Sequence, residues 1–260
     1  MRGSSEMEST MATSNQLRSS GEAIFLPDRQ RLLSSVDIST LFTAGVLTRC
    51  DHRDGWVDEL TPIEKKQIGD VCEKRYSEFA AGRSQARQLI ASLTGVAETL
   101  PIGDYRQPIW PASVTGSISH SDAYCAVAVA PRSLLDGLGI DVEPFEDLDK
   151  DVAEVVLTVA EQASTADIDA RLERSGALAM GARAHKLIFS IKEAIYKCCY
   201  PRVQAFIDFK QCNVSLDVAN QSYRAVIDCR DAKGEPVHME IDGKWLIEFD
   251  HIFAGAEYRV

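Results

Sequence analysis

The sequence predicts an α+β fold, in which helices cover β-sheets without a regular alternation of strand and helix. Three observations lead to this class. Apolar residues recur at helical spacing over residues 61–95 and again over 185–200, and short segments of strand character occur in groups at 113–130 and 206–260. With 260 residues, the chain can form one large domain or two small ones and bury a sizeable core.

A helix is expected to begin after Thr61 and to run to Gly95. Thr61 suits the N-cap, Pro62 suits the first helical position, and Glu64 can close a capping box. Apolar residues then follow at helical spacing: Ile63, Ile68, Val71, Cys72, Phe79, Ala86, Leu89, Ile90 and Leu93.

Three strands are expected next, at residues 113–119, 124–130 and 138–142. In the last of them, Asp141 and Glu143 are two positions apart, so both carboxylates leave on one face of the strand. Ile140 and Val142 enter the core on the other face. Two anions held side by side are unfavourable unless a cation lies between them or one takes a proton.

Residues 185–200 are expected to form a helix of about four turns, closed by Pro201. Glu193 and Lys197 are four positions apart on one edge of it, with Lys192 beside them. The simplest interpretation is an exposed ion pair worth a few tenths of a kcal/mol. Alternatively, Glu193 joins the two strand carboxylates in an all-oxygen site of the kind that suits Mg²⁺.

Beyond Pro201, strands are expected at 206–209, 211–216, 224–229, 237–241 and 245–249, with a last strand at 252–260. The dipeptide Asp242-Gly243 predicts a hairpin turn between two of these strands.

Composition excludes some classes of function. Lys and Arg total 28 against 39 Asp and Glu, and the net charge of −11 argues against a general nucleic-acid or anionic-membrane binder. No apolar run reaches the roughly 18 residues of a membrane span. Seven cysteines without close metal-ligand spacing suit the cytoplasm. Residues 1–21 are expected to be a disordered leader, because they are polar and lack the apolar core of a signal peptide.

Four segments, taken in order, resemble the 4'-phosphopantetheinyl transferase superfamily. They are Glu78–Arg83 with Ala86 and Arg87, Trp110-Pro111, Gly116–His120, and the pair Gly139–Pro144 and Phe189–Lys197. Over about residues 60–200 the chain is similar to siderophore-associated members, typified by enterobactin synthetase component D. The resemblance implies two pseudo-symmetric α/β halves with the active site in the cleft between them. The halves would be residues 22–135 and 136–260.

The resemblance also implies an activity. The 4'-phosphopantetheine group of coenzyme A would pass to a serine of an apo carrier protein, with Mg²⁺, releasing adenosine 3',5'-bisphosphate. Asp141, Glu143 and Glu193 would hold the metal, and Glu193 and Lys197 would be catalytic. Coenzyme A contacts are expected at Arg75, Arg83, Ser119, His120, Lys192 and Lys197. The partners would be carrier domains of a siderophore (nonribosomal peptide) synthetase, with no nucleic acid, and the protein would be a cytoplasmic monomer.

Two positions depart from the family pattern. Many relatives carry a basic residue where this chain has Tyr76 and a lysine where it has Ile102, which leaves Arg106 as the nearest cation that could compensate. Apart from the resemblance, Arg75 and Arg83 would be a solvated basic edge. Two other functions stay open: a Mg²⁺-dependent phosphohydrolase or nucleotidyl transferase, and a non-catalytic coenzyme A-binding protein.

Overall fold

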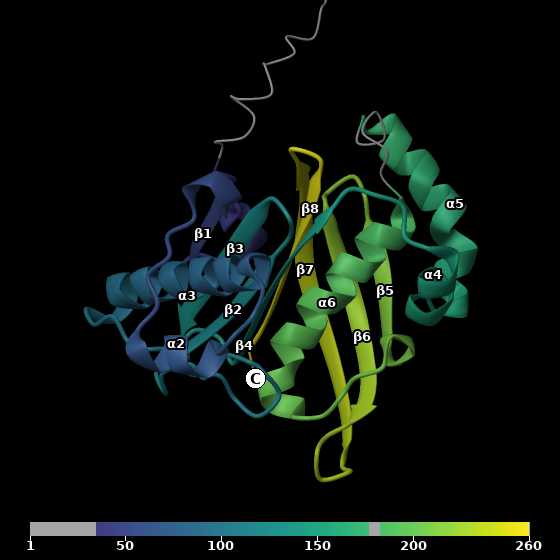
Figure 1. Ribbon diagram of the computed structural model, residues 1–260. Helices are drawn as coiled ribbons and strands as arrows, with labels where there is room; N and C mark the ends of the chain where they lie inside the picture. Colours follow the sequence, from purple (N-terminus) through teal and green to yellow (C-terminus); the bar gives the residue numbers. More distant parts are fainter. Residues whose placement is uncertain (1–34, 177–182, 260) are drawn as a thin grey trace, which may run out of the picture.

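The computed structural model describes residues 35–176 and 183–259, so the expected leader and the start of the first half, to residue 34, lie outside the described residues. The described chain forms two antiparallel sheets side by side, each covered by a long helix (Figure 1). The α+β class predicted from sequence is therefore confirmed. No helix among the described residues is long and apolar enough to cross a bilayer.

The first sheet has three strands in the order β1-β3-β2. The elements of this half of the chain are η1 (Ser39–Leu41), β1 (Leu47–His52), η2 (Arg53–Gly55), α2 (Pro62–Ile68), α3 (Glu73–Thr94), β2 (Val114–His120) and β3 (Tyr124–Pro131). Helix α3 packs on one face, where Gly82 lies against β2. A Cβ at Gly82 would meet Ile118 Cγ2 at 2.7 Å, so this glycine permits close packing of helix and sheet.

The helix expected from Thr61 to Gly95 is interrupted. Its predicted start is confirmed, because Thr61 caps α2 and forms a capping box with Glu64. However, α2 ends at Ile68, where Gly69 takes a φ of 66°, and α3 begins only at Glu73. This backbone conformation is open to glycine and stops a right-handed helix.

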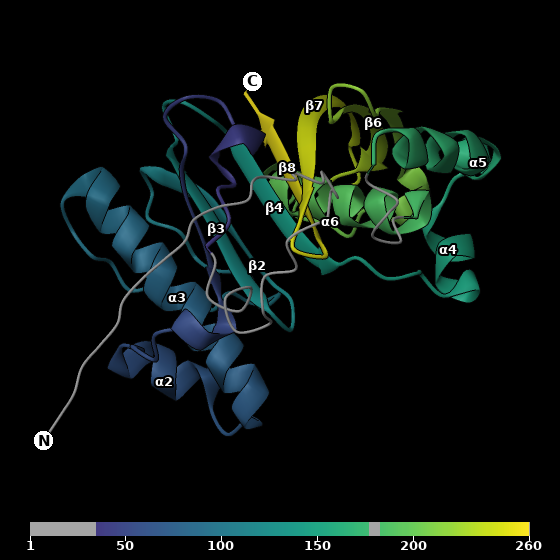
Figure 2. The same cartoon turned by 90° about the horizontal axis from the view of Figure 1, so that it is seen from above.

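The second sheet has five strands in the order β4-β8-β7-β6-β5. The elements of this second half are β4 (Gly137–Pro144), α4 (Lys150–Val156), α5 (Val159–Arg174), α6 (Ala184–Val203), η4 (Phe209–Gln211), β5 (Cys212–Asp217), β6 (Ser222–Arg230), β7 (Pro236–Glu248) and β8 (His251–Tyr258). Helix α6 covers this sheet. Figure 2 shows α2 and α3 on one side of the molecule and α4 and α5 on the other.

Three local predictions in this half are wrong. The hairpin expected at Asp242-Gly243 is absent from the described chain, because these residues lie within the continuous strand β7. Gly243 does not form a turn but lets the Tyr223 ring pack closely against β7, because a Cβ would lie 2.3 Å from that ring. The Tyr223 hydroxyl donates to the Gly255 carbonyl. Residues 206–208 are not in a strand, and α6 continues past Pro201 to Val203.

The two halves share a core along their junction. Buried Ala126 and Ala128 of β3 pack in one apolar cluster with Leu138 and Ile140 of β4 and with Phe253 of β8. The edge of β4 that faces β2 is hydrogen-bonded by serine hydroxyls instead of by strand backbone. Ser117, for example, accepts the Ile140 N–H. The junction is therefore packed and hydrogen-bonded, which fixes β4, the edge strand of the second sheet, against the first sheet.

Each half also begins a helix in the same way. In the first half the buried Glu64 accepts N–H bonds from Thr61 and Leu100 and pairs with Arg87. In the second, Glu161 accepts N–H bonds from Thr158 and Val214 and pairs with Lys192. The repeated arrangement fits two related halves, although the exact boundary near residue 135 stays a prediction.

Candidate active site

Asp141 lies at the centre of the site, on β4, with only 3% of its surface exposed. Its Oδ1 accepts from the ammonium of Lys197 at 2.7 Å and from the Ser119 hydroxyl at 2.9 Å. Its Oδ2 accepts from the Ser190 hydroxyl at 2.9 Å. These donors come from β2 and α6 and stabilise the negative charge of a buried carboxylate.

Glu143 and Glu193 lie in the same neighbourhood. Burial raises the pKa of Glu193, and the Asp141 carboxylate raises it further, against the opposite effect of Lys197. Burial and Asp141 likewise raise the pKa of Glu143, although Lys186 pairs with it at 2.6 Å. The carboxylates expected to converge therefore act on one another electrostatically, as like charges in a poorly solvated site do.

The fit of this site to a metal ion depends on its donors. The oxygens of Asp141, Glu143 and Glu193 are hard ligands of the kind Mg²⁺ prefers, and their crowding calls for a cation. Yet no group of three or more His, Cys, Asp or Glu side chains in residues 35–176 and 183–259 is arranged to hold a metal ion together. Instead, Lys197 and Lys186 balance the charge of Asp141 and Glu143. The donor chemistry fits Mg²⁺, and the observed arrangement is one in which ammonium groups provide the compensating charge.

A cationic pocket of about 240 Å³ lies in the first half, between α3, β2 and the loop before β2. Arg75, Arg83, Arg106 and His120 line it. Arg83 is fixed there, because its Nε donates to the Leu100 carbonyl at 3.0 Å and its guanidinium lies over the Phe79 ring. Burial lowers the pKa of Arg83 to about 10, which still leaves it charged at neutral pH. Such a pocket suits a phosphate group.

His120 is held between two charged neighbours. Its Nε2 lies 3.1 Å from Nη1 of Arg75, and its Nδ1 lies 3.6 Å from Oε2 of Glu78. Because arginine only donates, Nε2 must be the accepting nitrogen and Nδ1 must carry the hydrogen that faces Glu78. Burial lowers the pKa of His120, so the ring is neutral at pH 7 in this arrangement.

A second pocket of about 280 Å³ adjoins the cationic pocket and extends to Lys197, which contacts Asp141. The two pockets share Arg106, Pro108 and Ile118, and the second also has Lys197 in its wall. Tyr105, Trp110 and Tyr200 give it an aromatic lining. An extended ligand could therefore reach from the arginines to Lys197.

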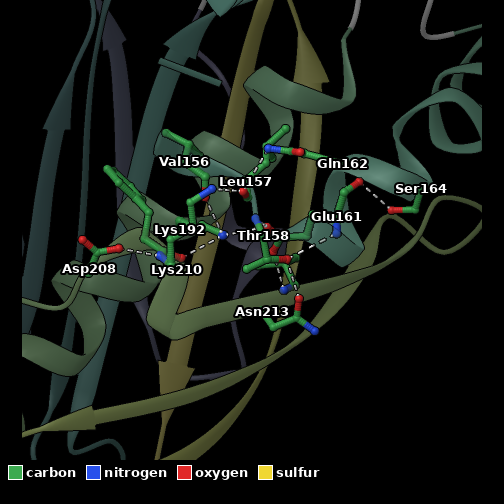
Figure 3. Close-up of polar contacts among 12 residues, drawn as sticks. Val156, Leu157, Thr158, Glu161, Gln162, Ser164, Lys192, Asp208, Lys210 and Asn213 are labelled. Carbon is green, nitrogen blue, oxygen red and sulfur yellow. Dashed lines mark hydrogen bonds and ion pairs between the residues drawn. The ribbon is translucent and has the colours of Figure 1, made fainter. Parts of the chain in front are cut away.

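Lys192, which is expected to contact coenzyme A, is engaged in contacts within the protein in this structure. Its ammonium donates to Oε2 of Glu161 at 2.7 Å and to the carbonyls of Val156 and Phe209, and its side chain is 1% exposed. Figure 3 shows Lys192 directed toward Glu161 and Val156. Adjacent residues on a helix point about 100° apart, so the Lys192 ammonium binds Glu161 while the Glu193 carboxylate interacts electrostatically with Asp141 and Lys197.

Ser119 is close to Asp141 and Lys197, but its hydroxyl hydrogen is already used. It donates to Oδ1 of Asp141, while its oxygen accepts from the Val142 N–H at 3.3 Å and from Lys197 at 3.0 Å. A hydroxyl has one hydrogen and two lone pairs, so these bonds use all of them. In this structure Ser119 therefore supports the carboxylate rather than offering a donor to a ligand.

Sequence reasoning missed Lys186 and Ser190. Both lie on the face of α6 that carries Glu193 and Lys197, because the four positions follow at intervals of four, three and four. That spacing was visible in the sequence. However, spacing does not by itself distinguish these two side chains from other polar residues of the helix, and neither carries a carboxylate that would suggest a metal ligand or a base.

Two family models match the chain. The 4'-phosphopantetheinyl transferase N-terminal domain matches residues 64–130, and the 4'-phosphopantetheinyl transferase superfamily model matches residues 137–250. The 4'-phosphopantetheinyl transferase Npt of Nocardia iowensis is 28% identical over 206 residues, which are 76% of this chain and 88% of the relative. PptT of Mycobacterium tuberculosis is 27% identical over 199 residues, 73% and 82% of the two chains. Enterobactin synthase component D of Escherichia coli is 29% identical over 184 residues, 70% and 79%.

Proposed function

Because the chain belongs to the 4'-phosphopantetheinyl transferase superfamily, we propose that it transfers the 4'-phosphopantetheine group of coenzyme A to a serine of an apo carrier protein. One observation carries the proposal. The buried Asp141 on β4 contacts Lys197 of α6 at 2.7 Å, beside a pocket that continues to the arginines of α3. Coenzyme A has a pyrophosphate and, at a distance from it, a 3'-phosphate. The carboxylates with Lys197 suit the first group, and the cationic pocket suits the second.

Coenzyme A would bind with its 3'-phosphate in the cationic pocket. Arg75, Arg83 and His120 are the groups there that we propose for this contact. Ile102 stands in the wall of the same pocket, and Arg106 lies in it too. Arg106 therefore provides a positive charge where the family pattern has a lysine at the position of Ile102.

The reaction needs charge neutralisation at a pyrophosphate and removal of a proton from a serine hydroxyl. Asp141, Glu143 and Glu193 would hold Mg²⁺, which when bound supplies the neutralisation. Lys197 would add positive charge at the reacting phosphate. Glu193, whose pKa is raised, would accept the serine proton, and adenosine 3',5'-bisphosphate would leave with the bond that breaks.

The relatives support a pathway as well as a reaction. Similarity to enterobactin synthase component D supports carrier domains of a siderophore synthetase as the partners. We propose a monomer that works in the cytoplasm, which agrees with the seven cysteines, all of them free thiols.

The test is a panel of apo carrier domains from siderophore, polyketide and fatty-acid pathways, each incubated with coenzyme A and Mg²⁺ and analysed by intact-mass spectrometry. We expect the siderophore carrier to gain one phosphopantetheine group fastest. Release of phosphate from coenzyme A without any carrier mass gain would instead indicate a phosphohydrolase. Binding of coenzyme A without either change would indicate a non-catalytic binding protein.

A further inference from the structure

We infer that Ser190 is a positioning residue for the reaction proposed above: it fixes the Asp141 carboxylate from the helix side, opposite the contacts made by Ser119. The inference rests on the proposed function for its catalytic consequence, but the geometry concerns this chain alone. Ser190 lies on α6, one turn before Glu193, and its side chain is fully buried.

The hydroxyl of Ser190 is directed to Asp141 rather than to its own helix. A serine within a helix commonly donates to the carbonyl four residues earlier. Here the Ser190 hydroxyl donates to Oδ2 of Asp141 at 2.9 Å, where both residues are buried. Removing one partner of a buried hydrogen bond leaves the other without compensation, so this contact resists rearrangement.

Two hydroxyls, one from each half of the molecule, hold the two oxygens of the same carboxylate. Ser119 of β2 donates to Oδ1, and Ser190 of α6 donates to Oδ2. With one donor on each oxygen, rotation about the Cβ–Cγ bond of Asp141 breaks at least one hydrogen bond. The plane of the carboxylate is therefore fixed by residues that need not touch the substrate.

The two carboxylate oxygens of Asp141 differ in the number of lone pairs that remain free to accept a further partner. Oδ1 accepts from both Ser119 and Lys197, which uses its two lone pairs. Among the hydrogen bonds of the described residues, Oδ2 accepts only from Ser190 and keeps one lone pair for a further partner. Ser190 thus orients the oxygen of Asp141 that is still free to bind a cation.

Hydrogen-bond partners of metal ligands typically change metal affinity by 10- to 100-fold when they are removed. We therefore expect Ser190→Ala to weaken the binding of a divalent ion by about 10-fold or more. Its kcat at fixed, subsaturating Mg²⁺ should fall, while the KM for coenzyme A should stay close to that of the wild type, because the arginine pocket is unchanged.

The chain offers a matched control in Ser84. This serine is also buried on a helix, at 2% exposure, but its hydroxyl has no hydrogen-bond partner among the described residues. Ser84→Ala removes the same atom from a similar environment away from Asp141. Ser190→Thr keeps a hydroxyl at the position of interest and serves as the conservative rescue.

The experiment measures Mn²⁺ binding to the full chain by electron paramagnetic resonance, without substrate, for the wild type, Ser190→Ala, Ser190→Thr and Ser84→Ala. We expect weaker binding in Ser190→Ala, recovery in Ser190→Thr and no change in Ser84→Ala. Wild-type affinity in Ser190→Ala would overturn the inference. If Ser190→Ala does not fold, Ser190→Cys replaces it, because a thiol is a much weaker hydrogen-bond donor than a hydroxyl, and wild-type Mn²⁺ affinity there would overturn the inference.

This readout also separates the inference from the proposed function. Failure of the wild type to modify any carrier would remove the proposed function but leave the Mn²⁺ comparison intact. Conversely, normal transfer by the wild type with unchanged Mn²⁺ binding in Ser190→Ala would remove only the role of Ser190.

Discussion

Lys192 and Glu161 form a buried ion pair in which Nζ and Oε2 are 2.7 Å apart and both side chains are 1% exposed. Two backbone carbonyls complete the hydrogen bonds of the ammonium, and two backbone N–H groups complete those of the carboxylate. A lysine next to the proposed base thus joins α6 to the start of α5. We therefore expect Lys192 to contribute to the stability of the fold rather than to the chemistry.

Lys192→Ala should lower the free energy of unfolding by about 3–5 kcal/mol, because it leaves the Glu161 carboxylate buried without its partner. Urea denaturation followed by circular dichroism measures this loss. The double variant Lys192→Met with Glu161→Gln should recover part of it, since no unpaired charge remains. A Lys192→Ala protein of wild-type stability but a much higher KM for coenzyme A would contradict this account.

Lys197→Ala should lower activity rather than stability, in contrast to Lys192→Ala. The side chain of Lys197 is 27% exposed and lines the second pocket, so its removal should lower kcat by a factor of about 10² or more through loss of one preorganised contact to phosphate. Initial rates of carrier modification at saturating coenzyme A measure the effect. Turnover within a factor of about two of the wild type would remove Lys197 from the proposed reaction.

Arg83→Ala should raise the KM for coenzyme A more than it lowers kcat, because the proposed contact is to a part of the substrate that does not react. Arg87, one turn further along α3, is the matched control, since it pairs with the buried Glu64. Arg87→Ala should destabilise the fold with little change in KM. Equal KM values for the two variants would show that the cationic pocket does not hold coenzyme A.

Glu193→Gln should stabilise the protein at neutral pH in the absence of divalent ions. The folded-state pKa of Glu193 is raised above its ordinary value of 4.5, so between these values the folded chain binds more protons than the unfolded chain. Stability from this group is therefore present at low pH and is lost as pH rises through the raised pKa. The stability gain from Glu193→Gln should appear by pH 7 and vanish below about pH 4.5.

Thermal unfolding of Glu193→Gln and wild type over this pH range, with chelator present, measures the difference. Glu98→Gln, at an exposed carboxylate in the loop after α3, is a control that should show no such trend. A stability difference that does not change with pH would contradict the raised pKa.

Local chemistry made several features predictable from sequence. Thr61, Pro62 and Glu64 specify a helix start because their bonds involve only neighbouring residues. The alternation around Asp141 predicted the correct strand and placed Ile140 and Val142 in the apolar core, on the face opposite Asp141, since a strand has a period of two. The spacing within α6 likewise placed Glu193 and Lys197 on one edge.

Contacts between segments that are distant in the sequence could not be predicted from local patterns. Gly243 resembles a turn residue, but it is a glycine because the Tyr223 ring lies over it from a neighbouring strand. Lys192 resembles a phosphate ligand, but its partner Glu161 is 31 positions away in the chain. The bond from Ser190 to Asp141 spans 49 positions. No periodicity records such pairings, so they become visible only in the folded chain.

The most direct test of the account compares wild type and Asp141→Ala in the modification of an apo siderophore carrier, by intact-mass spectrometry with Mg²⁺ and with chelator. We predict that the wild type adds one phosphopantetheine group when Mg²⁺ is present, and that chelator or Asp141→Ala abolishes the gain. Modification by Asp141→Ala at the wild-type rate, or by the wild type in chelator, would contradict an active site built around this carboxylate.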